Sequence, residues 1–97
     1  MRRLVVSAPA EADLEEIAAT EEARNPFRRQ RFLDDFHATA LRIAETALSY
    51  QVVHRDVRRA LLKQHPYAVF YRVLADDVLV VGVFHVRRSP RIIRRRR

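Results

Sequence analysis

The sequence contains no cysteine, only one glycine, Gly82, and no long apolar run. Without cysteine the chain has no disulfide, no thiolate chemistry and no cysteine-based zinc site. A single glycine excludes a glycine-rich loop that would cradle phosphate. No apolar run approaches the length of about 18 residues that a membrane helix needs, and the apolar stretch at 4–6 is far too short for a signal peptide. We therefore expect a cytoplasmic protein.

Acidic residues are absent beyond Asp77, although the 97-residue chain carries a net charge of +7. Its length and its apolar fraction of 48% fit one domain over residues 1–97 with a small core. The arginine-rich end attracts polyanions, either nucleic acid or an acidic protein segment. Residues 94–97 alone are also explained as a disordered basic tail that keeps the protein soluble.

The first half of the sequence predicts a short strand followed by two helices. An apolar run at 3–6 reads as the strand, and Ser7 is a suitable cap for a helix that ends near Arg24. Asn25 and Pro26 repeat the start signal, which predicts a second helix over about 26–48. So short a connection makes the two helices an antiparallel hairpin.

The second half predicts three strands, at 57–63, 67–74 and 78–86, after a connection at 50–55. The last strand is apolar almost throughout and is expected to lie centrally in the sheet. The resulting order, β-α-α-β-β-β, predicts an α+β fold in which an N-terminal strand and a helical hairpin precede a three-stranded antiparallel segment. The helices are expected to pack on one face of the sheet.

The polar residues at the end of the last strand are the candidate catalytic residues. His85 and Arg87 lie two apart and would share a strand face, and Arg88 could approach Arg58 or Arg59 across paired strands. Such a cluster suits metal-free RNA cleavage, with a base, an acid and arginines that stabilise the phosphate charge. The alternative is structural: His85 donates a hydrogen bond to the backbone, and Arg87 and Arg88 pair with helix acids such as Glu15 or Glu16.

Other polar residues predict no site. The four histidines are not at metal-ligand spacing, so neither a metal nor another cofactor is expected. Asp34 and Asp35 are neighbours on a helix and point about 100° apart, which excludes a catalytic dyad. Asp76 and Asp77 are explained as turn residues.

The pattern PYxVxYRV at 66–73, a short acidic turn, a hydrophobic strand and FHxRRxP at 84–90 together resemble the RelE/ParE superfamily. These proteins are the toxins of bacterial type II toxin–antitoxin pairs, and the resemblance is closest to the ParE-like branch. It implies the same order of elements, no cofactor, and a toxin that acts on DNA gyrase by stabilising cleaved complexes. It also implies neutralisation by a cognate antitoxin with an acidic, partly disordered C-terminal segment.

The RelE-like branch, whose members cut mRNA on the ribosome, is the first alternative. Its members usually place an arginine directly after the first strand tyrosine, whereas Ala68 follows Tyr67 here. They also tend to carry an aromatic residue after the arginine of the last strand, and no tyrosine or histidine follows His85. If the protein were a ribonuclease, its catalytic residues would be Arg59, His85 and Arg88. A basic nucleic-acid-binding module is the second alternative.

Contacts with the antitoxin or the target are expected from basic residues and spare aromatics. An acidic, partly apolar tail would fold onto the toxin, near Phe27, Phe32 and Tyr50, which lie outside the neatest apolar stripe of the hairpin. These aromatics could also support a homodimer. The predicted binding residues are Arg58, Arg59, Arg72, His85, Arg87, Arg88 and Arg91.

Overall fold

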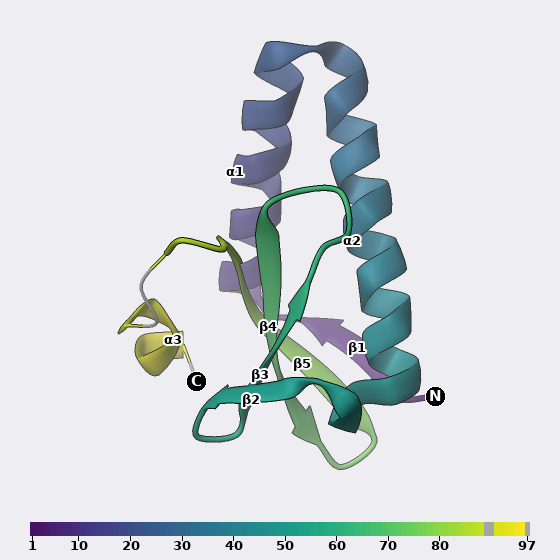
Figure 1. The fold of residues 1–97 in the computed structure, drawn as a ribbon, viewed down its shortest axis with the longest axis vertical. Coiled ribbons are helices and arrows are strands. Elements are labelled where there is room, and N and C mark those ends of the chain that lie inside the picture. Colours follow the sequence, from purple (N-terminus) through teal and green to yellow (C-terminus); the bar gives the residue numbers. More distant parts are fainter. Residues whose placement is uncertain (89–90, 97) are drawn as a thin grey trace.

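A computed structural model describes residues 1–88 and 91–96 of the chain. Two long helices stand on a twisted sheet, and a short third helix follows the last strand (Figure 1). Among the described residues, no helix has the length and apolar character needed to cross a membrane. The elements are β1 (Arg3–Val6), α1 (Ala8–Arg24), α2 (Pro26–Thr46), the 3-10 turn η1 (Ala47–Ser49), β2 (Gln51–His54), β3 (Val57–Leu61), β4 (Tyr67–Leu74), β5 (Asp77–His85) and α3 (Arg91–Arg96).

The helical hairpin forms where the capping residues predict it. The Ser7 side chain accepts a hydrogen bond from the Ala10 amide at 3.2 Å and so caps α1. The Asn25 side chain accepts from the Phe27 amide at 2.9 Å, and Pro26 opens α2. The Asn25 amide also donates to the Glu21 carbonyl at 3.3 Å. One residue therefore ends α1 and caps α2, and the two helices run antiparallel.

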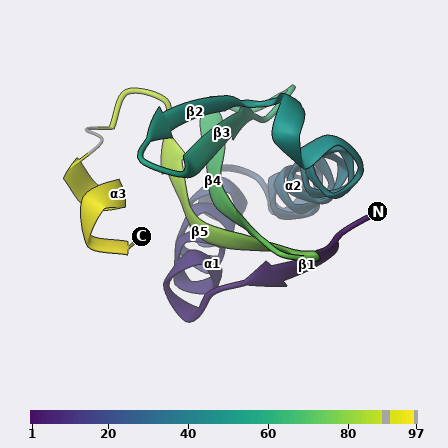
Figure 2. The same ribbon diagram turned by 90° about the horizontal axis from the view of Figure 1, so that it is seen from below.

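The sheet has five strands in the order β1-β5-β4-β3-β2, with the helical hairpin on one face (Figure 2). This confirms the predicted α+β class and the central place of the last strand. The structure adds two features. The segment predicted as a connection forms edge strand β2, and β1 pairs with β5 in parallel, so the sheet is mixed. Neither feature could be read from the local sequence. The residues of β2 do not alternate between apolar and polar, and the direction in which β1 pairs depends on β5, which is distant in the sequence.

Two turns of the sheet use residues other than glycine in the left-handed region. Arg55 has φ 51° between β2 and β3, and Ala75 has φ 52° between β4 and β5. Each turn has two residues, because His54 pairs with Val57 and Leu74 pairs with Asp77. Side chains with a Cβ are strained in this region by about 1–2 kcal/mol.

A β-bulge in β5 decides which side chains face the helices. Phe70 pairs with Gly82 and Tyr71 pairs with Val80, so Val81 is an extra residue in β5. After this bulge, Val83 points to the helices and Phe84 to the other side. A Cβ on Gly82 would lie 2.7 Å from the Phe84 ring, which explains a glycine inside this strand.

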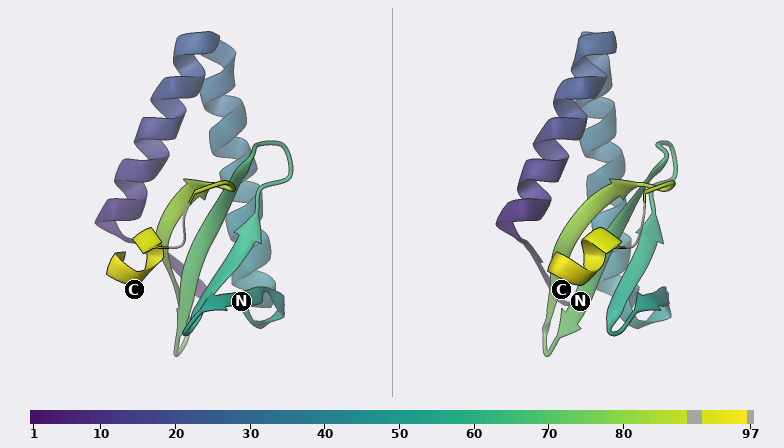
Figure 3. Two further views of the ribbon diagram at one scale, coloured as in Figure 1. Left: turned by 60° about the vertical axis from the view of Figure 1, so that its left-hand side comes forward. Right: turned by 90° about the vertical axis from the view of Figure 1, so that its left-hand side faces the viewer.

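Apolar side chains pack on both faces of the sheet. The helix face carries the larger cluster, which includes Phe32, Phe36, Ile43, Val69, Tyr71 and Val80. The opposite side, here called the far face, carries Val57, Ala68, Phe70, Val81 and Phe84. Helix α3 packs there through Ile93, on the side of the sheet away from the hairpin (Figure 3). Residues 94–96, expected in a disordered tail, lie in α3, and residue 97 lies outside the described residues.

Candidate functional site

The two arginines of β3 lie on opposite faces of the sheet. Arg58 is paired with Tyr71 and faces the helices, where its guanidinium donates to the Tyr50 carbonyl at 2.7 Å and to the Leu48 carbonyl at 3.2 Å. Arg59 is paired with Phe70 and faces the far side. Strand alternation is the cause. Arg58 therefore ties β3 to the end of the helical layer instead of presenting its charge to a partner.

The hydroxyl of Tyr71 lies deep in the same region and donates to the Ala47 carbonyl at 2.6 Å. The tyrosine is fully buried. Burial raises the pKa of Tyr71 to about 12, a shift that the charge of Arg58 partly opposes.

His85 ends β5 on the helix face. Its ring contacts Tyr67 edge-on, with centroids 5.5 Å apart, and Tyr67 contacts Phe32 in the same way at 5.7 Å. The chain turns immediately afterwards, because the Arg87 amide donates to His85 Nδ1 at 3.2 Å and the Arg88 amide donates to the His85 carbonyl at 2.9 Å. The prediction that His85 and Arg87 share a strand face is wrong, since the strand ends at His85. The His85 ring does bond the backbone, as an acceptor and not as the expected donor.

The remaining predicted arginines are spread over the far face and the last turn. Arg72 pairs with Asp56 at 3.1 Å, and the Arg88 guanidinium lies 5.2 Å from the centroid of the Phe84 ring. Arg87 is exposed. Within residues 1–88 and 91–96, no ion pair joins Arg87 or Arg88 to Glu15 or Glu16, the expected helix acids. The side chain of Arg91 lies outside the described residues.

The residues expected for ribonuclease chemistry are therefore divided by the sheet. His85 contacts Tyr67 on the helix face, whereas Arg59 is paired with Phe70 and Arg88 covers Phe84, both on the far face. General acid–base catalysis requires these groups within hydrogen-bond reach of one substrate. The structure does not bring them together.

A hollow between the helical hairpin and the β3–β4 loop was not predicted from the sequence. Its volume is about 420 Å³. We call it the hairpin hollow. Its lining residues are Glu21, Arg24, Arg28, Arg31, Gln64, His65, Pro66, Tyr67 and His85.

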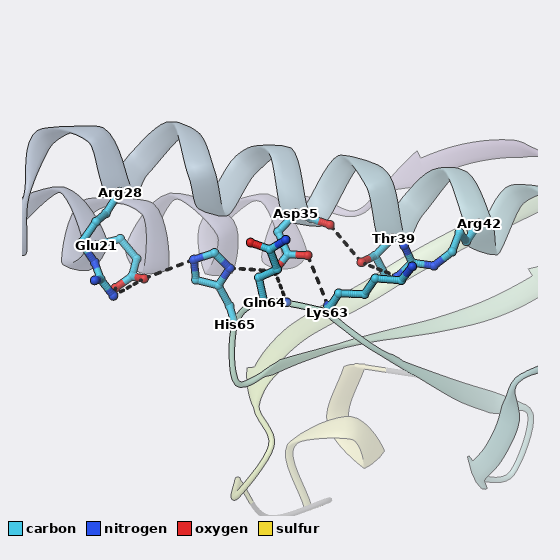
Figure 4. Close-up of polar contacts among 8 residues, drawn as sticks. All are labelled: Glu21, Arg28, Asp35, Thr39, Arg42, Lys63, Gln64 and His65. Atoms are coloured by element: carbon cyan, nitrogen blue, oxygen red, sulfur yellow. Dashed lines mark hydrogen bonds and ion pairs between the residues drawn. The ribbon is translucent and has the colours of Figure 1, made fainter.

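A cluster of buried polar side chains lies beside the hairpin hollow, which two of its members, Glu21 and His65, line; its polar contacts are drawn in Figure 4. Asp35, whose side chain is 6% exposed, accepts hydrogen bonds from the Lys63 amide at 3.2 Å and the Gln64 amide at 3.0 Å. Its carboxylate also lies 2.7 Å from His65 Nδ1. The other ring nitrogen of His65 lies 3.5 Å from the carboxylate of Glu21. Residues Glu21, Asp35 and His65 therefore tie the β3–β4 loop to both helices, and we call them the histidine cluster.

Arginine completes the polar surroundings of this cluster. The Arg28 guanidinium lies 3.2 Å from the Glu21 carboxylate, and Arg24 lies 4.0 Å from it. Nearby on the hairpin surface, the Arg29 guanidinium bonds Glu15 and lowers the pKa of that exposed carboxyl. No group of three potential ligands for a metal ion occurs among the residues that the structure describes.

A signal for Asp35 was present in the sequence. It lies three residues after Phe32 and four before Thr39, both fully buried, so it falls on the apolar stripe of α2. A carboxylate at such a position needs partners. Asp34, by contrast, is exposed, which agrees with the expectation that the two aspartates form no dyad.

The aromatic residues expected on a docking surface differ in exposure. Phe27 is 74% exposed at the start of α2, whereas Phe32 is fully buried in the core. Tyr50 is half-buried and packs edge-on against Tyr71 at 6.3 Å. The prediction for Phe32 is wrong because its position on α2 faces the sheet.

Comparison with known proteins matches this fold and most of the chain. A family model described as the ParE toxin of the type II toxin–antitoxin system parDE matches residues 4–90. The solved chromosomal ParDE system from P. aeruginosa is similar at 18% identity with a TM-score of 0.75, over 88% of this chain and 96% of that chain. The RelBE2 toxin–antitoxin complex from Mycobacterium tuberculosis is also 18% identical, with a TM-score of 0.46, over 87% of this chain and 96% of that chain.

A search of curated protein sequences finds no significant match. The family model nevertheless covers the two long helices, strands β2 to β5 and all of β1 except Arg3, including the motif residues at 66–73 and 84–90. The chain belongs to the ParE toxin family of type II toxin–antitoxin systems.

Proposed function

We propose that this protein is the toxin of a type II toxin–antitoxin pair, that it inhibits DNA gyrase, and that a cognate antitoxin neutralises it. The match of residues 4–90 to the ParE toxin family carries this proposal. Inhibition of gyrase is the activity that resemblance to the ParE-like branch implies.

The arrangement of the candidate catalytic residues supports an inhibitor over an mRNA endoribonuclease. His85 and Arg59 lie on opposite faces of the sheet. The Arg88 guanidinium lies against the Phe84 ring, where a cation is stabilised by the aromatic face. An inhibitor needs a binding surface and no acid–base pair, so this separation is compatible with its action.

The far face supports the second part of the proposal, a partner that is acidic and partly apolar. Arg59 and the Arg72–Asp56 pair lie there, and Arg88 is next to it. Exposed apolar side chains, including Leu61 at 53% and Leu74 at 39%, belong to the same face by strand alternation. A segment with alternating acidic and apolar residues would satisfy both kinds of group. Arg58 is withdrawn from the predicted set because its guanidinium is used internally.

Supercoiling of relaxed plasmid by purified gyrase tests the proposed activity. We expect the folded, antitoxin-free protein to abolish supercoiling and to cause cleaved DNA to accumulate. Heat-denatured protein at the same concentration is the control. Unaffected supercoiling would reject gyrase as the target. Ribosome-dependent mRNA cutting that is lost in the His85→Ala variant would then favour the endoribonuclease.

A further inference from the structure

The hairpin hollow has more positive than negative charge in its walls. Three guanidinium groups, those of Arg24, Arg28 and Arg31, line it together with one carboxylate, that of Glu21. Arg28 lies closest to Glu21, at 3.2 Å, while Arg24 is 4.0 Å away with its side chain 67% exposed. Arg31 is exposed and makes no ion pair within residues 1–88 and 91–96. The hollow therefore has more positive charge than the one carboxylate in its walls can neutralise.

The hollow is also lined by side chains that can donate hydrogen bonds besides the arginines. His85 Nδ1 accepts a hydrogen bond from the Arg87 amide, which leaves Nε2 as the donor of the ring. His85 and Tyr67 both line the hollow. Neither His85 Nε2 nor the Tyr67 hydroxyl has a hydrogen-bond partner in the described part of the chain. An anion in the hollow would thus meet donors as well as charge.

The part of the wall formed by Gln64, His65 and Tyr67 is held in place before any ligand arrives. The histidine cluster anchors the loop residues Gln64 and His65 to α2 through Asp35 (Figure 4). The Tyr67 ring is held between those of Phe32 and His85. A site with preformed walls loses less conformational entropy on binding.

We propose that the hairpin hollow binds the carboxylate of a single aspartate or glutamate side chain from the acidic segment of the antitoxin. The identity of the partner rests on the proposed function; the carboxylate site rests on the hollow itself. Arg24 and Arg31 neutralise the ligand's charge, and His85 and Tyr67 supply hydrogen-bond donors to its oxygens. This anchor lies on the helix side of the sheet and is separate from the arginines of the far face.

A carboxylate fits this site better than the phosphate of a nucleic acid. The Glu21 carboxylate in the wall is only 6% exposed and repels any anion that enters. A backbone phosphodiester and a carboxylate are both monoanions, so the acids around the hollow decide between them. The hairpin surface beside the hollow carries exposed acids, Glu15, Glu16 and Glu22. The sugar–phosphate backbone of a nucleic acid would have to run along these acids, whereas one inserted side chain avoids them.

Titration of the isolated protein with short peptides tests the proposal. The probes are the blocked tripeptides Leu-Glu-Leu and Leu-Gln-Leu, with inorganic phosphate at equal ionic strength as a third ligand. The signals are the NMR resonances of the His85 ring and of the arginine Nε groups. We expect saturable shifts with the glutamate peptide and at least about tenfold weaker binding of the glutamine peptide, since one charge-assisted contact is worth about 1.4 kcal/mol or more.

Two charge-matched variants make the test specific. We expect Arg31→Gln to weaken the glutamate peptide by about three- to tenfold, because an exposed guanidinium contributes about 1 kcal/mol to such a contact. Arg55→Gln removes the same charge from the β2–β3 turn, at the other end of the sheet from the hairpin tip (Figure 1). It should leave the affinity unchanged.

Each outcome decides the question. Equal binding of the two peptides, equal loss in the two variants, or tighter binding of phosphate than of the glutamate peptide would overturn the proposal. These measurements need neither gyrase nor antitoxin. Gyrase inhibition by a protein that does not bind the glutamate peptide rejects the carboxylate site alone. Peptide binding by a protein that leaves gyrase active rejects the proposed function alone.

Discussion

Replacement of Asp35 by alanine should destabilise the protein far more than the same change at its neighbour Asp34. The Asp35 carboxylate accepts from two loop amides and contacts His65 at 2.7 Å. Asp34 is exposed, and its carboxylate accepts one bond, from Gln30 at 2.8 Å. The two variants remove identical groups from adjacent residues of one helix, so their difference isolates the loop contacts.

The loss of stability in Asp35→Ala can be estimated from the hydrogen-bonding groups that lose their partner. A buried donor without an acceptor costs about 1–3 kcal/mol. Lys63 and Gln64 are exposed residues and their bonds to Asp35 are only partly buried, so each amide is assigned about 1 kcal/mol, at the low end of that range. The His65 side chain is only 12% exposed, and its Nδ1 is assigned about 1–2 kcal/mol. The free energy of unfolding of Asp35→Ala should therefore fall by about 3–4 kcal/mol, and that of Asp34→Ala by less than about 0.5 kcal/mol.

Urea unfolding monitored by circular dichroism measures this difference. With a slope of about 1.5 kcal/mol per molar urea, the midpoint of Asp35→Ala should lie about 2 M below that of the unmodified protein. The conservative variant Asp35→Asn keeps one acceptor oxygen and should fall between the two. A midpoint for Asp35→Ala within about 0.5 M of Asp34→Ala would refute the view that the histidine cluster holds the loop.

Three further changes test the core and the turns. Burial raises the pKa of Tyr71 from its ordinary value of 10.0 to about 12. The neutral hydroxyl therefore contributes about 2–3 kcal/mol to the free energy of unfolding below about pH 10, and this contribution is lost as the pH rises through 12. Urea unfolding at each pH should show this loss in the unmodified protein and not in Tyr71→Phe. Ala75→Gly removes the backbone strain of a residue at φ 52° and should raise the midpoint of thermal unfolding by about 3–5 °C. Ala38→Gly, on the exposed face of α2, is the control and should lower the midpoint, because glycine is unfavourable inside a helix. Gly82→Ala would place a Cβ 2.7 Å from the buried Phe84 ring and should cost about 1–3 kcal/mol in the same thermal assay.

Each of these expectations has a contradicting result. An alkaline loss of stability that is equal with and without the Tyr71 hydroxyl would assign the loss to other groups. A lower thermal midpoint for Ala75→Gly would mean that the flexibility of glycine in the unfolded chain outweighs the relief of strain. An unchanged midpoint for Gly82→Ala would show that the Phe84 ring can move aside.

The helices were predictable because their signals are local. Ser7 caps α1, and Asn25 with Pro26 starts α2, each within three residues of the group that it serves. The apolar spacing of both helices needs only the period of 3.6 residues. The order of elements and the face that the helices cover followed from these same short-range patterns.

Pairing between distant strands had no such signal. Strand β2 has four residues, and its burial pattern does not alternate. The parallel pairing of β1 with β5 joins Arg3 to Asp77, which lie 74 residues apart in the sequence. Such pairs form because the folded chain brings them together, and neither partner marks the other in the sequence.

The sequence by itself determined the fold class, the two helices, the central strand and the family, because each depends on local period, capping or a contiguous motif. Only the tertiary structure decided the candidate site. The extra residue Val81 in β5 reverses the alternation after it, so His85 faces the helices and not the side of Arg59. The contact of Asp35 with His65 spans 30 residues, and its existence depends on how the hairpin sits on the sheet.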